Sequence, residues 1–256
     1  MDMRRTRQMA TFLLALQFLT RLPVRVDDSA SDLIAESPRW YPAVGIVVGV
    51  IVGLVQIGAA QIWPSLVAAV LSTATGIVLT GALHEDGLAD TCDGLGGGRT
   101  RERALEIMRD SRIGSYGALA LILVIAGKIA VLASLPASAA FWVLIAGHAA
   151  SRGSMLWVMQ VLPYARAEGA GSATARRQLP DGVRVAGVTT GLALLPLAFV
   201  LPYHAMALGL AGLVAGHFAA RRRFARRLGG YTGDCLGATQ QCSELGFLLG
   251  CLAFTA

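Results

Sequence analysis

The sequence has little charge for its length. Only 15% of its 256 residues are charged and 55% are hydrophobic, whereas a soluble domain usually has about 25% charged residues. Its 22 basic residues include one lysine, Lys128. The four cysteines include no CxxC pair, which argues against a disulfide framework or a zinc site of the usual spacing. The shortage of charge, with 30 glycines, predicts a polytopic membrane protein.

No linker, low-complexity tail or clear internal repeat divides the chain, so we expect a single integral-membrane domain over residues 1–256. The basic N-terminus lacks a convincing cleavage site, and Arg21 and Arg25 follow its short apolar stretch. We therefore predict no removable signal peptide. The net charge of +6 comes from arginines in short loops between apolar runs. Membrane orientation and phosphate binding explain it better than a nucleic-acid partner does.

Long apolar runs predict an all-α fold, a bundle of about seven transmembrane helices. The stretch 9–22 is too short to cross a bilayer and is basic at both ends, so we expect it to lie in the interface or to re-enter. The seven runs are residues 41–62, 64–83, 115–135, 139–162, 184–202, 203–220 and 236–256.

The connections between these runs alternate in charge. Three of them contain no charged residue, whereas the loops at 99–112, 166–184 and 221–227 are rich in arginine. The positive-inside tendency places the arginine-rich loops and the N-terminus in the cytoplasm. All the motif-bearing segments then lie on the cytoplasmic side.

The densest group of carboxylates follows the second apolar run. Asp86, Asp90 and Asp93 are spaced i, i+4, i+7, which puts them on one face of a helix. Two carboxylates about 6 Å apart repel by roughly 3 kcal/mol at an effective dielectric near 20. A hard divalent cation removes this conflict; the alternative is a solvated first helical turn. We predict these residues to be catalytic and metal-binding, with the adjoining His84 as a ligand or base.

A second charged motif lies downstream. Arg103, Arg109 and Arg112 interleave with Glu106 and Asp110. This alternation suits a diphosphate, because carboxylates bind its cation and guanidinium groups bind its oxygens. The sequence therefore predicts substrate-binding arginines, with Asp110 as a further metal ligand. The alternative is a surface helix with salt bridges.

Three polar residues near or within later apolar runs are further candidates for substrate binding. Arg152 is costly in mid-span, so we expect it to face the bundle interior, paired with a carboxylate or bound to substrate phosphate. Glu244 lies inside the last run. Lys128, in the run 115–135, is a candidate structural partner for it. Asp234 follows a glycine-rich turn and is expected to be an N-cap or a metal or substrate ligand.

These motifs have a known counterpart. The strings LTGALHEDGLADTCDGL and RALEIMRDSRIGSYGALAL, with FLTRLPV near the N-terminus and GGYTGD before the last run, resemble the cobalamin synthase family, the adenosylcobinamide-GDP ribazoletransferases. The resemblance covers most of the chain. Glu85 departs from the family pattern, which commonly has an apolar residue there.

The resemblance implies the last assembly step of adenosylcobalamin, or vitamin B12. A ribose hydroxyl of α-ribazole, or of its 5′-phosphate, attacks the phosphorus on the cobinamide side of adenosylcobinamide-GDP, and GMP leaves. Family members are multi-pass inner-membrane proteins that use Mg²⁺, here one or two ions on the predicted aspartates. The lipid bilayer is the other expected partner, and a homo-oligomer or association with other cobalamin-assembly enzymes stays open.

Two alternative functions remain at this point. A CDP-alcohol phosphotransferase pattern begins at Asp90, but the Ala-Arg pair that it requires does not follow. A metabolite or cation transporter would have its charged residues near the bilayer midplane and inverted repeats. Here the densest charge is expected at one surface, and no such repeat is evident.

Overall fold

The computed structural model describes residues 3–26, 31–166 and 179–253, and these residues are almost entirely helical. The one exception to helix and loop in these ranges is an isolated bridge between Tyr164 and Tyr231. The all-α prediction is confirmed. The elements are α1 Met3–Leu19, α2 Ser31–Glu36, η1 Ser37–Trp40, α3 Tyr41–Ala60, α4 Ser65–Thr80, α5 Leu83–Gly97, α6 Arg101–Ile107, α7 Ser115–Ser134, α8 Ala137–Val161, α9 Pro180–Leu194, α10 Leu197–Val200, α11 Tyr203–Leu228 and α12 Gly233–Leu252.

Prolines start the helices that follow the uncharged turns. Pro64, Pro136 and Pro202 occupy the N-cap positions of α4, α8 and α11, each with φ near −55° and an extended ψ. A proline fixes φ and has no N–H to leave unpaired, so it suits the position where a helix begins. These short turns reverse the chain without any charged residue, as the sequence predicted.

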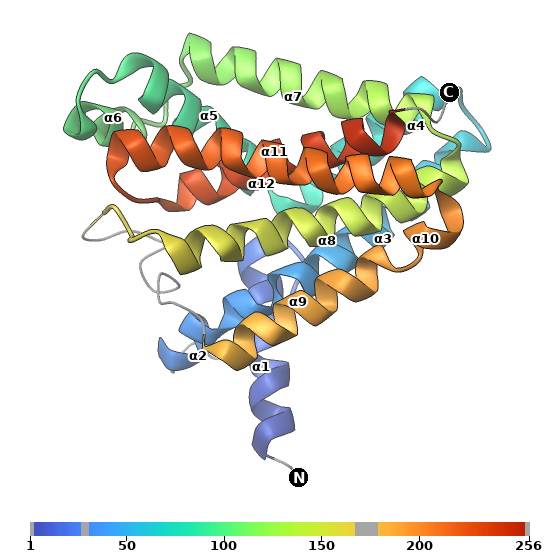
Figure 1. Cartoon of the computed structure of the whole chain (residues 1–256), viewed down its shortest axis with the longest axis horizontal. Helices are drawn as coiled ribbons and strands as arrows, with labels where there is room; N and C mark the ends of the chain where they lie inside the picture. The colour runs from blue at the N-terminus through green and yellow to red at the C-terminus, as the bar shows by residue number, and fades with distance from the viewer. Residues whose placement is uncertain (1–2, 27–30, 167–178, 254–256) are drawn as a thin grey trace.

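The long helices run roughly along one axis, whereas α1 crosses that direction (Figure 1). Helix α12 contacts α5, α7, α8 and α11, and α8 also contacts α3 and α9. Helices α8 and α12 are therefore the interior pair of the bundle. The ends of α5, α8 and α11, together with α6, lie at the left of Figure 1, which gathers the motif-bearing loops at one end.

Four helical segments are long and apolar enough to cross a membrane in the described part of the chain: Asp32–Ala60, Ser115–Ser134, Pro180–Val200 and Tyr203–Leu228. A fifth arises if the bent pair α4–α5 counts as one span. Four or five segments pass this criterion, so the membrane character is confirmed, and the number of about seven spans stays a prediction.

Interior polar side chains explain the difference in number. Helices α8 and α12 have the length of spans, but they carry charged and amide residues, including Arg152, Gln240 and Glu244, whose side chains are buried inside the bundle. Such residues lower a helix's hydropathy without exposing any polar group to lipid. The hydropathy criterion therefore misses helices that are shielded by their neighbours.

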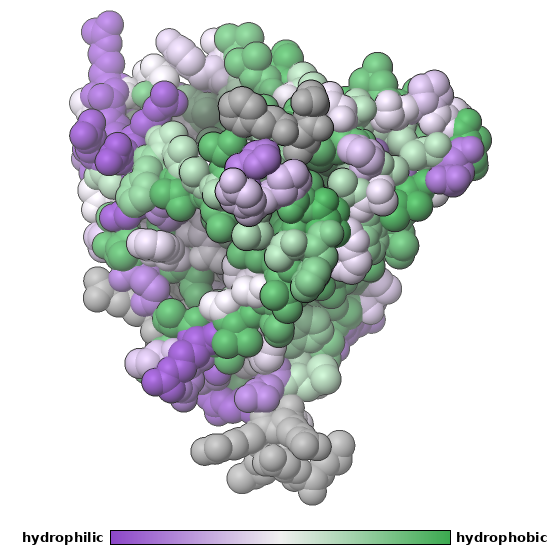
Figure 2. All heavy atoms as spheres, turned by 45° about the vertical axis from the view of Figure 1, so that its right-hand side comes forward, coloured by the Kyte–Doolittle hydropathy of each residue, from purple (hydrophilic) through white to green (hydrophobic). Residues whose placement is uncertain are grey.

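The peripheral helices expose apolar side chains. Leu123 on α7 is 70% exposed, Leu192 on α9 is 63% exposed and Phe199 on α10 is 86% exposed. Figure 2 shows a broad hydrophobic area over the centre of one face, with hydrophilic residues at its edges. A water-facing surface rarely carries so large an apolar patch, so contact with lipid explains it.

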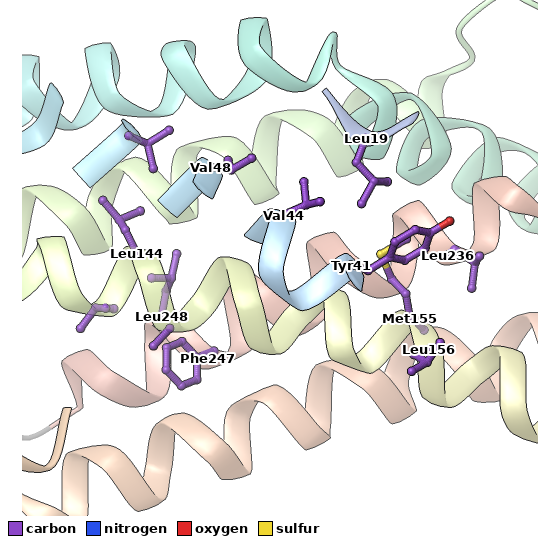
Figure 3. Packing of buried hydrophobic residues seen from close by; sticks show 14 of the residues in the cluster. Leu19, Tyr41, Val44, Val48, Leu144, Met155, Leu156, Leu236, Phe247 and Leu248 are labelled. Carbon is purple, nitrogen blue, oxygen red and sulfur yellow. The ribbon is translucent and has the colours of Figure 1, made fainter. Parts of the chain in front are cut away.

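The core lies between α3, α8 and α12. Val44 and Val48 of α3 face Leu144 of α8 and Leu248 of α12 in a continuous cluster of buried residues (Figure 3). Leu19, at the end of α1, packs on the same cluster. This packing fixes the axes of the helices that carry the buried polar residues.

One predicted loop is a helix. The arginine-rich segment 221–227 continues α11, which ends at Leu228 before Gly229 in the left-handed region, at φ 67°. Arginine is a good helix former, and basic residues suit a helix C-terminus, so the charge alone did not end the helix. Residues 167–178 of the predicted 166–184 loop lie outside the described residues.

Candidate functional site

The acidic motif lies on a separate helix rather than on a continuation of the second apolar run. Helices α4 and α5 meet at 87°, because Gly81 and Ala82 both adopt left-handed conformations, at φ 63° and 58°. The backbone N–H of Arg21 donates to the Leu79 carbonyl at 2.7 Å, so the N-terminal segment braces the bend. The chain turns here and brings α5 against α12.

The predicted acidic helix is confirmed, and burial increases along it. Asp86 is exposed, Asp90 is half-buried and Asp93 is 8% exposed. Their i, i+4, i+7 spacing on α5 gives them a common face, but the three environments differ. We expect the roles of these residues to differ as well.

Asp93 anchors the start of α7. Its two carboxylate oxygens accept hydrogen bonds from the backbone N–H groups of Gly114, at 2.7 Å, and Gly117, at 2.8 Å. A side chain at either glycine would collide with this carboxylate. Asp93 therefore satisfies free N–H groups of a helix start and ties α7 to α5; its predicted metal role stays a prediction.

The loop end of α8 adds an arginine that the sequence analysis did not single out. Arg166 Nη2 donates to Asp234 Oδ2 at 2.9 Å. The residues just before Arg166 are held against the loop that precedes α12. The backbone N–H of Tyr231 donates to the Pro163 carbonyl, and the backbone N–H of Ala165 donates to the Tyr231 carbonyl. The signal in the sequence was only that Arg166 opens an arginine-rich loop; its partner, 68 residues away, was not predictable.

Asp234 lies in the first turn of α12 and is not its N-cap. Thr232 is the N-cap and accepts from the Cys235 N–H at 3.3 Å. Asp234 and Asp86 both act electrostatically on Asp90, as does Arg166. We call Asp86, Asp90 and Asp234 the acidic cluster. It brings together the acidic motif on α5 and the first turn of α12.

The acidic cluster is not a closed metal cage. Within the described ranges, no three His, Cys, Asp or Glu side chains are grouped closely enough to hold one ion. Three like charges around a half-buried position nevertheless require a cation or a proton. Mg²⁺ is commonly bound by one or two carboxylates, with water and substrate phosphate as its other ligands, so the donor set fits Mg²⁺ that arrives with a diphosphate.

Two glycines allow α5 and α12 to approach closely. A Cβ on Gly87 would lie 2.8 Å from the Asp234 carbonyl oxygen, and one on Gly237 would lie 3.0 Å from the His84 carbonyl oxygen. Gly87 therefore permits helix–helix packing rather than the approach of a ligand. This contact sets the separation of the two helices that carry the acidic cluster.

Replacing Gly87 by alanine is expected to destabilise the protein by about 1–3 kcal/mol and to lower its activity, because α12 must shift away with Asp234. Gly58→Ala is the matched control, since a Cβ there meets nothing within 4 Å, and alanine is the better helix former. Thermal unfolding in detergent measures both variants. Equal melting temperatures for the two would contradict the packing argument.

The arginines of the second motif are not equivalent. Arg103 pairs with Glu106 at 2.8 Å and Arg112 pairs with Asp110 at 2.6 Å, all on the surface. Arg109 is exposed, and no partner for its side chain is recorded among the described residues. Arg109 is thus the guanidinium most available to a phosphorylated substrate.

Asp110 pairs with Arg112 at the surface. Helix α6 ends at Ile107, so Asp110 lies beyond the helix that carries Glu106. Hydrogen bonds from Arg112 lower the pKa of the Asp110 carboxyl to about 2. The metal role of Asp110 stays a prediction.

Glu244 and Arg152 belong to a buried polar network inside the bundle. Glu244 pairs with Lys128 of α7 at 2.7 Å and with His148 of α8 at 3.1 Å. Arg152 is 1% exposed, and its Nη1 donates to the His148 carbonyl at 3.1 Å. The interior position predicted for Arg152 is confirmed. The arrangement joins α7, α8 and α12, and substrate binding by either residue stays a prediction.

His84 faces this network rather than the acidic cluster's solvent side. It is 2% exposed and lines a cavity of about 30 Å³ together with Glu85, Arg152 and Gln241. Gln241 donates to Glu85 Oε1 at 2.9 Å. A volume of this size suits about two water molecules among polar groups. Glu85, the residue that departs from the family pattern, thus points into the bundle and contacts α12.

The sequence profile of the family described as cobalamin-5-phosphate synthase matches residues 11–252 of this chain. An adenosylcobinamide-GDP ribazoletransferase of Leptothrix cholodnii is 45% identical over 249 residues, which cover 94% of each chain. A protein of the same name from Azorhizobium caulinodans is 42% identical, with 98% of each chain covered. One from Vibrio parahaemolyticus is 38% identical, with 96% and 93% covered. No solved structure matches.

Proposed function

The chain belongs to the cobalamin-5-phosphate synthase family, and from this premise we infer that it is an adenosylcobinamide-GDP ribazoletransferase. It joins adenosylcobinamide-GDP to α-ribazole, or to α-ribazole 5′-phosphate, and releases GMP. This agrees with the resemblance seen in the motifs, and it sets aside the CDP-alcohol phosphotransferase and the transporter.

The acidic cluster is the observation that supports a site for this reaction. Displacement at a diphosphate needs neutralised phosphate oxygens, a stabilised leaving group and an in-line nucleophile. We propose that Asp86 and Asp90, one turn apart on α5, hold Mg²⁺ with the substrate diphosphate. Bound Mg²⁺ would stabilise the charge that develops on the phosphate and on GMP.

The arginines position the diphosphate. Arg109 is exposed at the loop end of the bundle, where its planar fork suits phosphate oxygens. Arg166 is held at the cluster by Asp234 at 2.9 Å and adds a second positive charge. Arg103 and Arg112 are committed to local ion pairs, so we assign them a smaller part in binding.

Asp90 is the best placed of the carboxylates to accept the ribose proton. It is half-buried and feels the charges of Asp86 and Asp234, and partial burial beside like charges favours proton uptake. His84 is a weaker candidate because its ring is 2% exposed and lines the interior cavity. The proton of the attacking hydroxyl therefore passes to Asp90 as the new phosphodiester bond forms and the bond to GMP breaks.

We propose that the protein lies in the bacterial inner membrane with this site facing the cytoplasm. The motif-bearing loops gather at one end of the bundle (Figure 1), where the segment 99–112 and the C-terminal turns of α11 each contain five arginines. Cysteine labelling of Arg226→Cys and Gln61→Cys, both exposed positions, in spheroplasts, each in a background where the four native cysteines are replaced by alanine, tests the orientation. Labelling of position 226 from the outside would reverse it.

The function is tested by incubating purified protein with adenosylcobinamide-GDP, α-ribazole and Mg²⁺. GMP and adenosylcobalamin should form in equal amounts, and a chelator should abolish both. Absence of GMP release under these conditions refutes the activity. Full release in the presence of the chelator refutes the metal requirement alone.

Arg109→Ala is expected to raise the KM for adenosylcobinamide-GDP by about 10- to 100-fold, because a hydrogen bond to a charged group contributes roughly 1.5–3 kcal/mol. The KM for α-ribazole should not change. Arg184→Ala is the matched control, since Arg184 is a 78% exposed arginine on α9 that pairs with Asp181. Steady-state kinetics of both variants gives the comparison, and equal KM values would remove Arg109 from the site.

A further inference from the structure

A broad apolar hollow lies on one side of the bundle. It has a volume of about 580 Å³ and is lined by residues of α8, α9 and α11. Helix α8 contacts both of the other helices, so it forms the floor of the hollow, and α9 and α11 form its two sides (Figure 1). Most of the lining residues are apolar or glycine. We call this hollow the α8–α11 groove, and the proposed reaction does not use it.

The groove opens outward, to the side where lipid is expected. Trp157, Val183 and Val214 line it and are 55%, 44% and 48% exposed. Helices α9 and α11 both belong to segments that are long and apolar enough to cross a membrane. An apolar hollow that stays empty forfeits dispersion contacts, and water finds few hydrogen-bonding partners in it. A hydrocarbon chain from the bilayer is therefore the occupant that this lining favours.

Two arginines of α11 lie beside the groove. Phe218 lines the groove, and the guanidinium carbons of Arg221 and Arg222 lie 5.5 and 5.4 Å from the centre of its ring. Neither guanidinium has a recorded hydrogen bond or ion pair with a described residue, and α11 itself contains no Asp or Glu. The groove therefore adjoins positive charge that no described carboxylate neutralises.

These arginines lie beyond one end of the groove. Its lining residues fall within 150–161 on α8, 183–194 on α9 and 213–218 on α11. The C-terminal ends of α8 and α11 and the N-terminal end of α9 lie on the same side of the bundle (Figure 1). Arg221 and Arg222 follow Phe218 toward that side, where the motif-bearing loops gather. A chain that lies along the groove can therefore have its polar head at the arginines, at the membrane surface.

We propose that the α8–α11 groove binds one anionic phospholipid, with an acyl chain along α8 and the headgroup phosphate at Arg221 and Arg222. Guanidinium groups suit phosphate oxygens, and basic residues next to a membrane span favour anionic lipids, by about fivefold for each residue. A zwitterionic lipid would bring a second cation to the two arginines, so a headgroup with net negative charge is preferred. This site goes beyond the proposed function and does not depend on it.

Native mass spectrometry tests the headgroup contact. Protein purified in a non-ionic detergent is incubated with equal amounts of phosphatidylglycerol and phosphatidylcholine of the same acyl chains, and the retained lipids are counted. The wild type should retain one phosphatidylglycerol with a preference of about 25-fold, and Arg222→Gln should lower this preference about fivefold. Arg223→Gln is the matched control. It removes an exposed arginine of the same helix whose charge acts on Cys92 of α5, and the preference should stay that of the wild type.

Two glycines of α9 allow the acyl-chain contact to be tested in the same experiment. Gly187 and Gly191 line the groove, and a Cβ at either position meets nothing within 4 Å. Leucine is also a better helix former than glycine, so Gly187→Leu and Gly191→Leu should fold and fill part of the groove. Each should lower retention of both lipids by at least about tenfold. Gly58→Leu on α3, which has the same open surroundings outside the groove, should retain lipid as the wild type does.

Equal retention of the two lipids by the wild type would overturn the proposal, as would equal losses of preference in the Arg222 and Arg223 variants. Unchanged retention in both α9 variants would do the same. A lipid-free dimer would assign the groove to a second copy of the chain, and release of the retained lipid by α-ribazole would assign it to the substrate. Because no turnover is measured, a protein that releases GMP but retains no lipid refutes this site and leaves the proposed reaction standing.

Discussion

Replacing Asp90 by asparagine is expected to lower kcat by at least about 10²–10³-fold, the size of effect seen when one group that stabilises transition-state charge is removed. Asparagine keeps the size of the side chain but can neither take up the ribose proton nor bind a cation as strongly. The substitution also removes one of three like charges at this position, so folding and membrane insertion should be preserved. Single-turnover release of GMP at saturating substrate measures the loss.

The matched control is Glu102→Gln. Glu102 is an exposed carboxylate on α6, at the same end of the bundle, and the same change from acid to amide there should leave kcat as it is. A titration with Mg²⁺ separates the two roles given to Asp90. A variant whose activity returns at high Mg²⁺ has lost a metal ligand, whereas one that stays inactive has lost the base. Normal turnover by Asp90→Asn at ordinary Mg²⁺ would remove the acidic cluster from the mechanism.

Glu244→Gln should destabilise the protein by about 3–5 kcal/mol, because it leaves a buried ammonium without its counter-charge. The Lys128–Glu244 pair joins α7 to α12 at 2.7 Å, and the two side chains are 8% and 4% exposed. Chemical denaturation in detergent micelles measures the effect. Asp181→Asn, which breaks the exposed pair with Arg184, should produce no measurable change.

The double variant Lys128→Met with Glu244→Gln tests whether the pair is structural. Removing both charges should recover most of the stability, because a buried pair replaced by neutral groups of similar volume is often close to neutral. If the recovered protein also turns over normally, Glu244 has no part in substrate binding. Recovery of stability with a raised KM would support the substrate role predicted from the sequence.

Several features of this protein could be predicted from particular residues. The i, i+4, i+7 spacing of Asp86, Asp90 and Asp93 predicted the helix that carries them, because helical periodicity is a local property of the chain. Arg152 was predicted to be interior because an arginine in an apolar run has no other low-cost position. The family follows from strings of adjacent residues, which need no fold to be compared.

The sequence was misleading where the outcome depended on neighbours in space. It did not show that Gly81 and Ala82 turn the chain by 87° between the second apolar run and the acidic motif. It predicted a loop at 221–227, where α11 continues. The number of about seven spans stays a prediction, because hydropathy along the chain does not show which polar residues are covered by other helices.

The sequence by itself determined the family, the all-helical membrane character and the candidate residues for binding a metal and a diphosphate, since these follow from composition and local spacing. Only the tertiary structure decided that Asp234 and Arg166 join Asp86 and Asp90, that Asp93 anchors α7, and that Glu244 pairs with Lys128. Each of these contacts joins helices that are distant in the chain, and their separations are fixed by packing, such as that of Gly87 against α12.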